Sequence, residues 1–112
     1  MGKVSTVGID LAKDSVQMFF CDLKDKKLGN KSLSKNKLIS TIEGMDKEDN
    51  FLIAMESCGG AHYWGRKFMS LGYKVVLIAP HFVAPFVKGN KNDSNDAEAI
   101  AIAARQASMR FV

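Results

Sequence analysis

The first third of the chain alternates apolar and polar residues with the period of a β-strand. Residues 4–10 are rich in β-branched side chains, and Val7 and Ile9 fall on one face. Apolar runs resume at residues 16–21 and, more weakly, at residues 27–33, each after a polar turn. We therefore predict three short strands joined by tight turns in an antiparallel meander.

The period changes to that of a helix after Ser34, which we expect to be the helix N-cap. Apolar residues then recur three or four positions apart, at Leu38, Ile39, Ile42 and Met45. Gly44 and the charged residues 46–50 end this segment. The pattern predicts one helix between the meander and the rest of the chain.

Two continuous apolar runs, at residues 51–56 and 74–79, are typical of strands buried inside a sheet. Pro80 stops the second run. A helix between them opens at Gly59, and we expect Gly72 to close it. The apolar stripe of this helix consists of Ala61, Trp64, Phe68 and Leu71.

The last helix, at about residues 94–107, is rich in alanine and follows a polar loop at residues 88–92. Its stripe of Ala97, Ile100, Ala101 and Ala104 allows close packing within the chain. The element order βββαβαβα predicts an α/β fold: a mixed five-stranded sheet with helices on both faces. Right-handed crossovers place the fourth strand beside the first, which is the RNase H-like architecture.

Composition excludes several classes of protein. The chain has 112 residues, 46% of them hydrophobic and 25% charged, which is typical of one globular domain. It carries no secretory signal and no apolar run approaching the roughly 18 residues of a membrane span. Cys21 and Cys58 show no pairing pattern, so we expect reduced thiols in a cytoplasmic protein without membrane contact. The net charge of +4 favours polyanionic partners modestly.

Four carboxylates stand at the ends of predicted elements. Asp10 closes the first strand, Glu56 closes the fourth, and Asp93 and Asp96 begin the last helix. In the predicted topology these ends meet, because ligand sites gather beyond the carboxyl ends of parallel strands. Four converging negative charges need cations, and oxygen ligands favour Mg²⁺ or Mn²⁺. We expect two such ions, the arrangement that serves phosphodiester chemistry.

Each carboxylate also has a plainer explanation when it is taken alone. Asp10 opens a turn, and Glu56 is an ordinary charge at a strand end. Asp93 as N-cap and Asp96 in the first turn would stabilise the helix through its dipole. The joint placement of all four at one end of the predicted sheet favours the metal site.

Three segments carry a resemblance to a known family: VGIDLAK at residues 7–13, MESCGGAHYW at 55–64 and FVKGNKNDSNDAEAI at 86–100. They are similar, in the same order, to the N-terminal region of DEDD transposases of the Piv/IS-one-ten family of bacterial insertion sequences. The resemblance covers nearly the whole chain. It implies a RuvC-like fold and maps the family's four acidic residues onto Asp10, Glu56, Asp93 and Asp96.

The resemblance also implies partners. In this family a C-terminal domain supplies a serine nucleophile and an element-encoded guide RNA selects the DNA sites. We therefore expect this chain to be the RuvC-like domain, over residues 1–112, of a transposase that cleaves and transfers DNA strands. We expect the serine-bearing domain to lie outside this chain. Guide RNA, assembly into a homo-oligomer and association with the nucleoid are expected of the full-length protein.

Basic residues border the predicted site, and two other functions stay open. Lys13, Arg66, Lys88 and Lys91 are candidates for phosphate contacts, although a solvated loop explains lysines equally well. A resolvase acting on branched DNA would use the same four carboxylates. A non-catalytic nucleic-acid-binding module would carry them as structural groups. ATP-binding relatives of this fold need a second domain and a second phosphate loop, neither of which this sequence contains.

Overall fold

The computed structural model of the chain describes residues 3–45, 50–90 and 92–112. Its strands are β1 (Thr6–Leu11), β2 (Ser15–Cys21), β3 (Lys27–Ser34), β4 (Leu52–Glu56) and β5 (Lys74–Ile78). Its helical elements are η1 (Lys35–Lys37), α1 (Leu38–Glu43), α2 (Gly59–Ser70), α3 (Pro80–Val83), η3 (Ala84–Phe86) and α4 (Asp93–Ala104).

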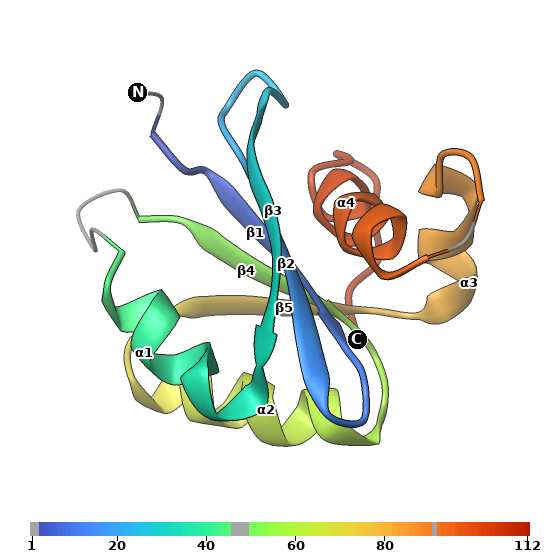
Figure 1. Cartoon of the computed structure of the whole chain (residues 1–112). Coiled ribbons are helices and arrows are strands. Elements are labelled where there is room, and N and C mark those ends of the chain that lie inside the picture. Colours follow the sequence, from blue (N-terminus) through green and yellow to red (C-terminus); the bar gives the residue numbers. More distant parts are fainter. Residues whose placement is uncertain (1–2, 46–49, 91) are drawn as a thin grey trace.

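The described strands form one five-stranded sheet in the order β3-β2-β1-β4-β5 (Figure 1). β2 pairs antiparallel with both β1 and β3, which confirms the predicted meander. β4 pairs parallel with β1 on one side and with β5 on the other. The first and fourth strands are therefore neighbours, as the RNase H-like topology requires.

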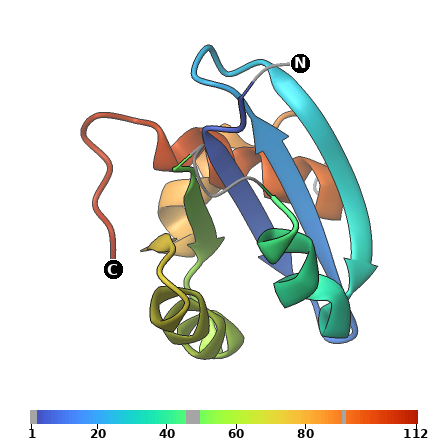
Figure 2. The same cartoon turned by 90° about the vertical axis from the view of Figure 1, so that its left-hand side faces the viewer.

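Helices cover both faces of the sheet, as the sequence predicts. α1 and α2 lie on one face, and α3 and α4 lie on the other (Figures 1 and 2). Strand side chains alternate between the faces, so Ile9 and Met55 pack on the side of α1 and α2. Ala54 and Ile78 pack against Ile100 of α4. Each strand of the sheet's centre is thus buried on both sides, which explains its continuous apolar sequence.

α4 lies directly on the backbone of β1. A Cβ atom added to Gly8 would sit 2.3 Å from the carbonyl oxygen of Ala97 and 2.9 Å from the amide nitrogen of Ala101. Only glycine in the strand and small residues on the helix permit this approach. Phe19 and Cys21 complete the small buried cluster around Ala97 and Ala101. The predicted intramolecular packing of the alanine stripe is confirmed.

The second half of the chain differs from the prediction in three places. The apolar stretch after Pro80 forms α3 and η3, whereas the sequence pattern predicts no helix there. β5 is only half-buried over most of its length because it is the edge strand, although the N–H of Val112 covers part of the edge by donating to the oxygen of Leu77 (2.8 Å). α4 begins at Asp93 and ends at Ala104, slightly earlier at both ends than expected.

Helix ends account for the other differences. Ser34 precedes η1 rather than α1, because a turn of 3-10 helix intervenes, and its hydroxyl donates to Oδ1 of Asn36. Gly72 has a φ of +94°, which confirms its expected role just past the end of α2. Residues 46–49 of the predicted charged loop lie outside the described residues.

The structure also bears on the predicted surroundings of the protein. Within the described ranges no helix is both long and apolar enough to span a membrane. Cys21 and Cys58 are free thiols, the first buried and the second exposed. Burial is the main cause that raises the pKa of the Cys21 thiol above its ordinary value.

Candidate metal centre

Two of the predicted carboxylates lie at the carboxyl ends of neighbouring parallel strands, Asp10 as the last residue but one of β1 and Glu56 as the last residue of β4. Ile9 of β1 is in register with Met55 of β4, so Asp10 and Glu56 are the next residues on each strand. Side-chain alternation places both on the face that carries Ala54, which is covered by α4. Both residues are half-buried. The sheet therefore presents two acidic groups to the start of α4.

The first turn of α4 supplies the other two carboxylates. Asn92 is the N-cap, since its side chain accepts a hydrogen bond from the N–H of Asn95 (2.8 Å). The capping interpretation of Asp93 is therefore wrong: Asp93 already lies inside the helix. Both aspartates lie in the first turn of α4, so the structure is consistent with the expectation that Asp96 stabilises the helix through its dipole. Asp93 and Asp96 are one turn apart on α4, and both lie near the end of β1.

Three of these carboxylates converge. One oxygen from each of Asp10, Asp93 and Asp96 lies within 4.8 Å of the other two. Asp93 is exposed, whereas Asp10 and Asp96 are at least half-buried. An octahedral cation with bonds of about 2.1 Å holds neighbouring ligand atoms about 3.0 Å apart and opposite ones about 4.2 Å apart. Small side-chain rotations would bring the three oxygens around one ion, and an all-oxygen set suits a hard divalent cation.

Glu56 stands beside this cluster rather than within it. Glu56 and Asp96 line the same cavity, which has a volume of about 520 Å³. The rest of its wall is formed by Pro80, Val83, Ala84, Val87 and Gly89. A cavity of this size has room for a bound group between Glu56 and the three converging carboxylates.

A series of hydrogen-bonded polar side chains links the sheet to the first turn of α4, which carries Asp93 and Asp96 and is called the acidic turn below. Gln17 lies opposite Asp10 in the β1–β2 pair, and its Nε2 donates to Oδ1 of Asn30 on β3. Asn30 Nδ2 in turn donates to Oγ of Ser94 (2.8 Å) and to its carbonyl oxygen (3.1 Å). Ser94 lies between the two aspartates of α4. These hydrogen bonds hold the acidic turn in position relative to the sheet, as the hydrogen-bond partners of metal ligands do at metal sites.

The four basic residues predicted to contact phosphate differ in their position relative to the carboxylates. Lys88 lies between two lining residues of the cavity, is exposed, and places its Nζ 4.0 Å from Oε2 of Glu98. Lys13 is exposed in the β1–β2 turn that follows Asp10. Arg66 lies on α2, on the opposite face of the sheet, so its expected place beside the carboxylates is wrong. Lys91 lies outside the described residues.

Sequence reasoning missed two parts of this site. The cavity wall from α3 carries a recognisable signal, because Pro80 occupies the first turn of that helix, where proline is favoured. The Gln17–Asn30–Ser94 chain carries none, since its members are ordinary polar residues brought together from three elements.

Comparison with known proteins shows the family to which the chain belongs. A family model described as a transposase, of the DEDD type named for IS110, matches residues 7–112. The chain belongs to this family. It is 42% identical over 112 residues to the transposase for insertion sequence element IS1111A of Coxiella burnetii, covering 100% of this chain and 30% of that protein.

Other members of the transposase family match over the same region. The chain is 42% identical over 109 residues to a probable family 20 transposase of Pseudomonas aeruginosa, covering 97% of this chain and 31% of that protein. The chain therefore spans about a third of the length of these curated relatives. The match confirms the resemblance that the three sequence segments carry.

Solved structures support the fold assignment. The chain superposes on the RuvC structure of Thermus thermophilus with a TM-score of 0.63 at 12% identity, covering 96% of this chain and 99% of that one. The same protein in complex with its Holliday junction substrate gives a TM-score of 0.59, with coverage of 96% and 98%. At this identity the likeness shows the fold, and it confirms the predicted RuvC-like, RNase H-like architecture.

Proposed function

We propose that this chain is the metal-holding catalytic domain of a DNA transposase of an insertion sequence, which cleaves and joins DNA strands. The observation that carries the proposal is the convergence of Asp10, Asp93 and Asp96 at the end of β1, in a chain of the transposase family. RuvC, which shares the fold, has been solved with a Holliday junction substrate. That complex supports branched or double-stranded DNA as the substrate class here.

Each acidic residue has a defined place in the proposed site. Asp10, Asp93 and Asp96 hold one Mg²⁺ or Mn²⁺ ion, and Glu56 holds a second across the shared cavity. Bound metal of this kind neutralises the negative charge that develops on a phosphodiester and lowers the pKa of a bound attacking group. Without a cation, the three converging carboxylates would repel one another strongly.

Residues outside the acidic set prepare the cavity for a phosphate. Val83 and Val87 add apolar surface to the cavity that Glu56 lines, which limits the water around the charged groups. Lys88 and Lys13, at the borders of this end of the sheet, would attract the nucleic-acid backbone. The Gln17–Asn30–Ser94 bonds hold the acidic turn in place during binding.

Strand transfer itself belongs to the full-length protein in this proposal. The curated relatives are about three times as long as the matched region. We assign the serine nucleophile to a C-terminal domain, and guide-RNA selection of DNA sites and homo-oligomeric assembly to the full-length, cytoplasmic and nucleoid-associated protein. The family resemblance supports these assignments.

Calorimetric titration with Mn²⁺ tests the site directly. We expect the wild-type chain to bind Mn²⁺ and Asp10→Asn to weaken binding at least tenfold, because one charged ligand is lost. Asp14→Asn removes an equal charge from an exposed turn four residues away and leaves binding unchanged. Absence of Mn²⁺ binding in the wild type, or equal binding by both variants, would favour a structural role for the carboxylates.

Cleavage assays distinguish the two catalytic hypotheses, a transposase domain and a junction resolvase. In the full-length protein, Asp10→Asn should abolish metal-dependent strand cleavage while circular dichroism shows an unchanged fold. The 112-residue chain alone should leave a synthetic four-way junction intact. Metal-dependent cutting of that junction by the chain alone would instead identify a junction resolvase.

A further inference from the structure

Positive charge is concentrated in one short segment of this chain. Residues 24–37 contain six lysines and a single acidic residue, so this segment alone carries a formal charge of +5, whereas the whole chain carries +4. The lysine strip, as we name it, consists of Lys24, Lys26, Lys27, Lys31, Lys35 and Lys37. The rest of the protein is therefore close to neutral, and the basic character comes from one place.

The fold displays this segment along one edge of the molecule. The strip begins in the β2–β3 turn, follows β3 and ends in η1. β3 is an outer strand of the sheet and runs from that turn down to α1 (Figure 2). Of the six lysines, five are exposed and Lys35 is half-buried. The Nζ of Lys31 lies 5.7 Å from the ring centroid of Phe20, which steadies its stem at the surface.

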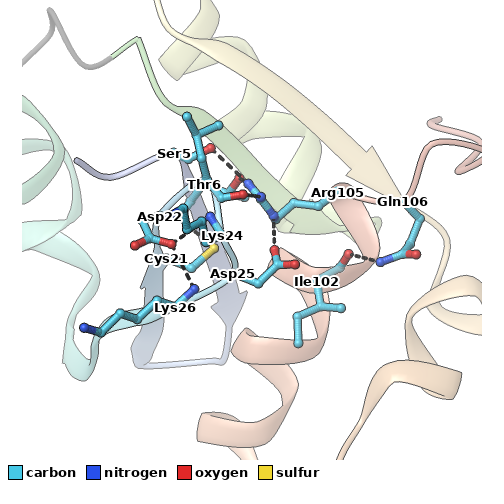
Figure 3. Close-up of polar contacts among 11 residues, drawn as sticks. Ser5, Thr6, Cys21, Asp22, Lys24, Asp25, Lys26, Ile102, Arg105 and Gln106 are labelled. Atoms are coloured by element: carbon cyan, nitrogen blue, oxygen red, sulfur yellow. Dashed lines mark hydrogen bonds and ion pairs between the residues drawn. The ribbon is translucent and has the colours of Figure 1, made fainter. Parts of the chain in front are cut away.

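Two acidic residues, Asp22 and Asp25, lie beside the first lysines of the strip. Oδ1 of Asp22 accepts hydrogen bonds from the N–H groups of Lys26 (2.9 Å) and Lys24 (2.8 Å), which hold the pKa of that carboxyl below its ordinary value. Asp25 forms an ion pair with Arg105, which also donates to the hydroxyl of Ser5 (Figure 3). Among the residues that the structure describes, no lysine of the strip forms an ion pair.

The strip also ends at the same end of the sheet as the metal centre. β1 and β3 are each antiparallel to β2, so they run in the same direction and end at the same side of the sheet. Asp10 stands near the end of β1, and Lys35 and Lys37 follow the end of β3. A linear polyanion that follows the strip would reach the end of the sheet at which Asp10 lies, although Lys31, in register with Met18, projects from the face that carries α1 and α2.

We propose that the lysine strip binds the phosphate backbone of a nucleic acid that engages the same molecule. From Lys27 to Lys35 the chain advances eight residues, about 26 Å at roughly 3.3 Å per residue. That length equals the rise of about eight nucleotides at roughly 3.4 Å per phosphate along one strand of a duplex. Contacts of this kind are independent of sequence and position the ligand without reading its bases.

The inference rests on the proposed function for its ligand class, because both invoke a nucleic acid. The two sources of the phosphate backbone are a DNA duplex and an RNA duplex. Lysines on an edge strand have a second use, which is to prevent the strand from pairing with another chain. The test must therefore separate DNA from RNA, and backbone binding from protection of the edge.

Fluorescence anisotropy with labelled 20-base-pair DNA and RNA duplexes of equal sequence makes this separation. The strip variant combines Lys27→Gln, Lys31→Gln and Lys35→Gln. The matched control combines Lys67→Gln, Lys74→Gln and Arg110→Gln, which removes the same charge from exposed positions outside the strip. Light scattering on both variants reports whether the edge still resists self-association.

We expect the strip variant to bind at least tenfold more weakly than the control at about 0.1 M salt. Because each phosphate contact contributes about 0.9 to the slope of log affinity against log salt, the slope should fall by about 2–3 for DNA. Loss confined to one duplex identifies that nucleic acid as the ligand. Equal weakening in both variants, or unchanged binding with new self-association in the strip variant, overturns the inference.

The same proteins titrated with Mn²⁺ separate this inference from the proposed function. The strip variant should keep wild-type Mn²⁺ affinity, because none of its lysines belongs to the acidic cluster. If the wild-type chain binds Mn²⁺ but neither duplex, the inference that the lysine strip binds nucleic acid is wrong, and the proposed metal centre is unaffected. A chain that binds duplexes through the strip and no Mn²⁺ would overturn the catalytic proposal alone.

Discussion

Replacing Gly8 with alanine tests whether close packing of α4 on β1 builds the acidic cluster. The new Cβ would lie 2.3 Å from the Ala97 oxygen and 3.0 Å from the Ala101 Cβ. Carbon and carbonyl oxygen approach one another to about 3.3 Å in folded proteins, so α4 must retreat by about 1 Å. The obstructing atoms belong to helix backbone and cannot rotate away. Overpacking of this kind costs about 1–3 kcal/mol, and we expect the upper end of that range.

The same retreat should damage metal binding. Asp93 and Asp96 move with α4, whereas Asp10 stays with the sheet. Ligand distances in metal sites tolerate only about 0.2 Å, so a displacement of about 1 Å should lower Mn²⁺ affinity at least tenfold. Urea denaturation measures the free energy of unfolding, and calorimetry measures the Mn²⁺ affinity of the folded variant.

Gly65→Ala is the matched control. A Cβ at Gly65 would meet Val75 at 3.7 Å, an ordinary contact, in the interior of α2. Alanine is the better helix former, so this variant should be more stable by up to about 1 kcal/mol and bind Mn²⁺ normally. If Gly8→Ala unfolds at the wild-type urea concentration and keeps wild-type Mn²⁺ affinity, close packing does not position the site.

Two further predictions concern the surroundings of the site. Asn30→Ala removes the hydrogen bonds to Ser94, so it should lower the free energy of unfolding by about 1–2 kcal/mol and the Mn²⁺ affinity severalfold. The control variant, Asn36→Ala in η1, should leave the Mn²⁺ affinity unchanged. Equal Mn²⁺ affinities of the two variants would show that Asn30 does not position the first turn of α4. Because burial raises the pKa of Cys21, its stabilising contribution is complete below the unfolded thiol pKa and is lost as pH rises through the folded value. Urea midpoints between pH 7.5 and about 10 should therefore fall less steeply for Cys21→Ala than for wild type; parallel slopes would contradict this.

The sequence predicts those features that rest on local pattern or on topology. β4 is buried on both faces, so its apolar run is unbroken, and the handedness of crossovers then places it beside β1. From that adjacency follows the placement of Asp10 and Glu56 at the same end of the sheet. The approach of Asp93 and Asp96 follows from the alanine stripe, which allows α4 to lie flat on the sheet.

Other features depend on contacts that no local pattern records. α3 is hidden because two prolines and an apolar run resemble a loop, although Pro80 occupies the one part of a helix that accepts it. Asn30 and Ser94 are 64 residues apart, and neither residue type is unusual in its setting. The placement of Arg66 failed because sequence alone does not state which face of the sheet carries α2.

Anomalous diffraction from crystals soaked in Mn²⁺ tests the central claim most directly. We predict a peak within about 2.3 Å of carboxylate oxygens of Asp10, Asp93 and Asp96, and a second peak beside Glu56 in the shared cavity. Crystals that show no manganese at these carboxylates, or show it only at other sites on the molecule, would contradict the metal centre on which the proposed function stands.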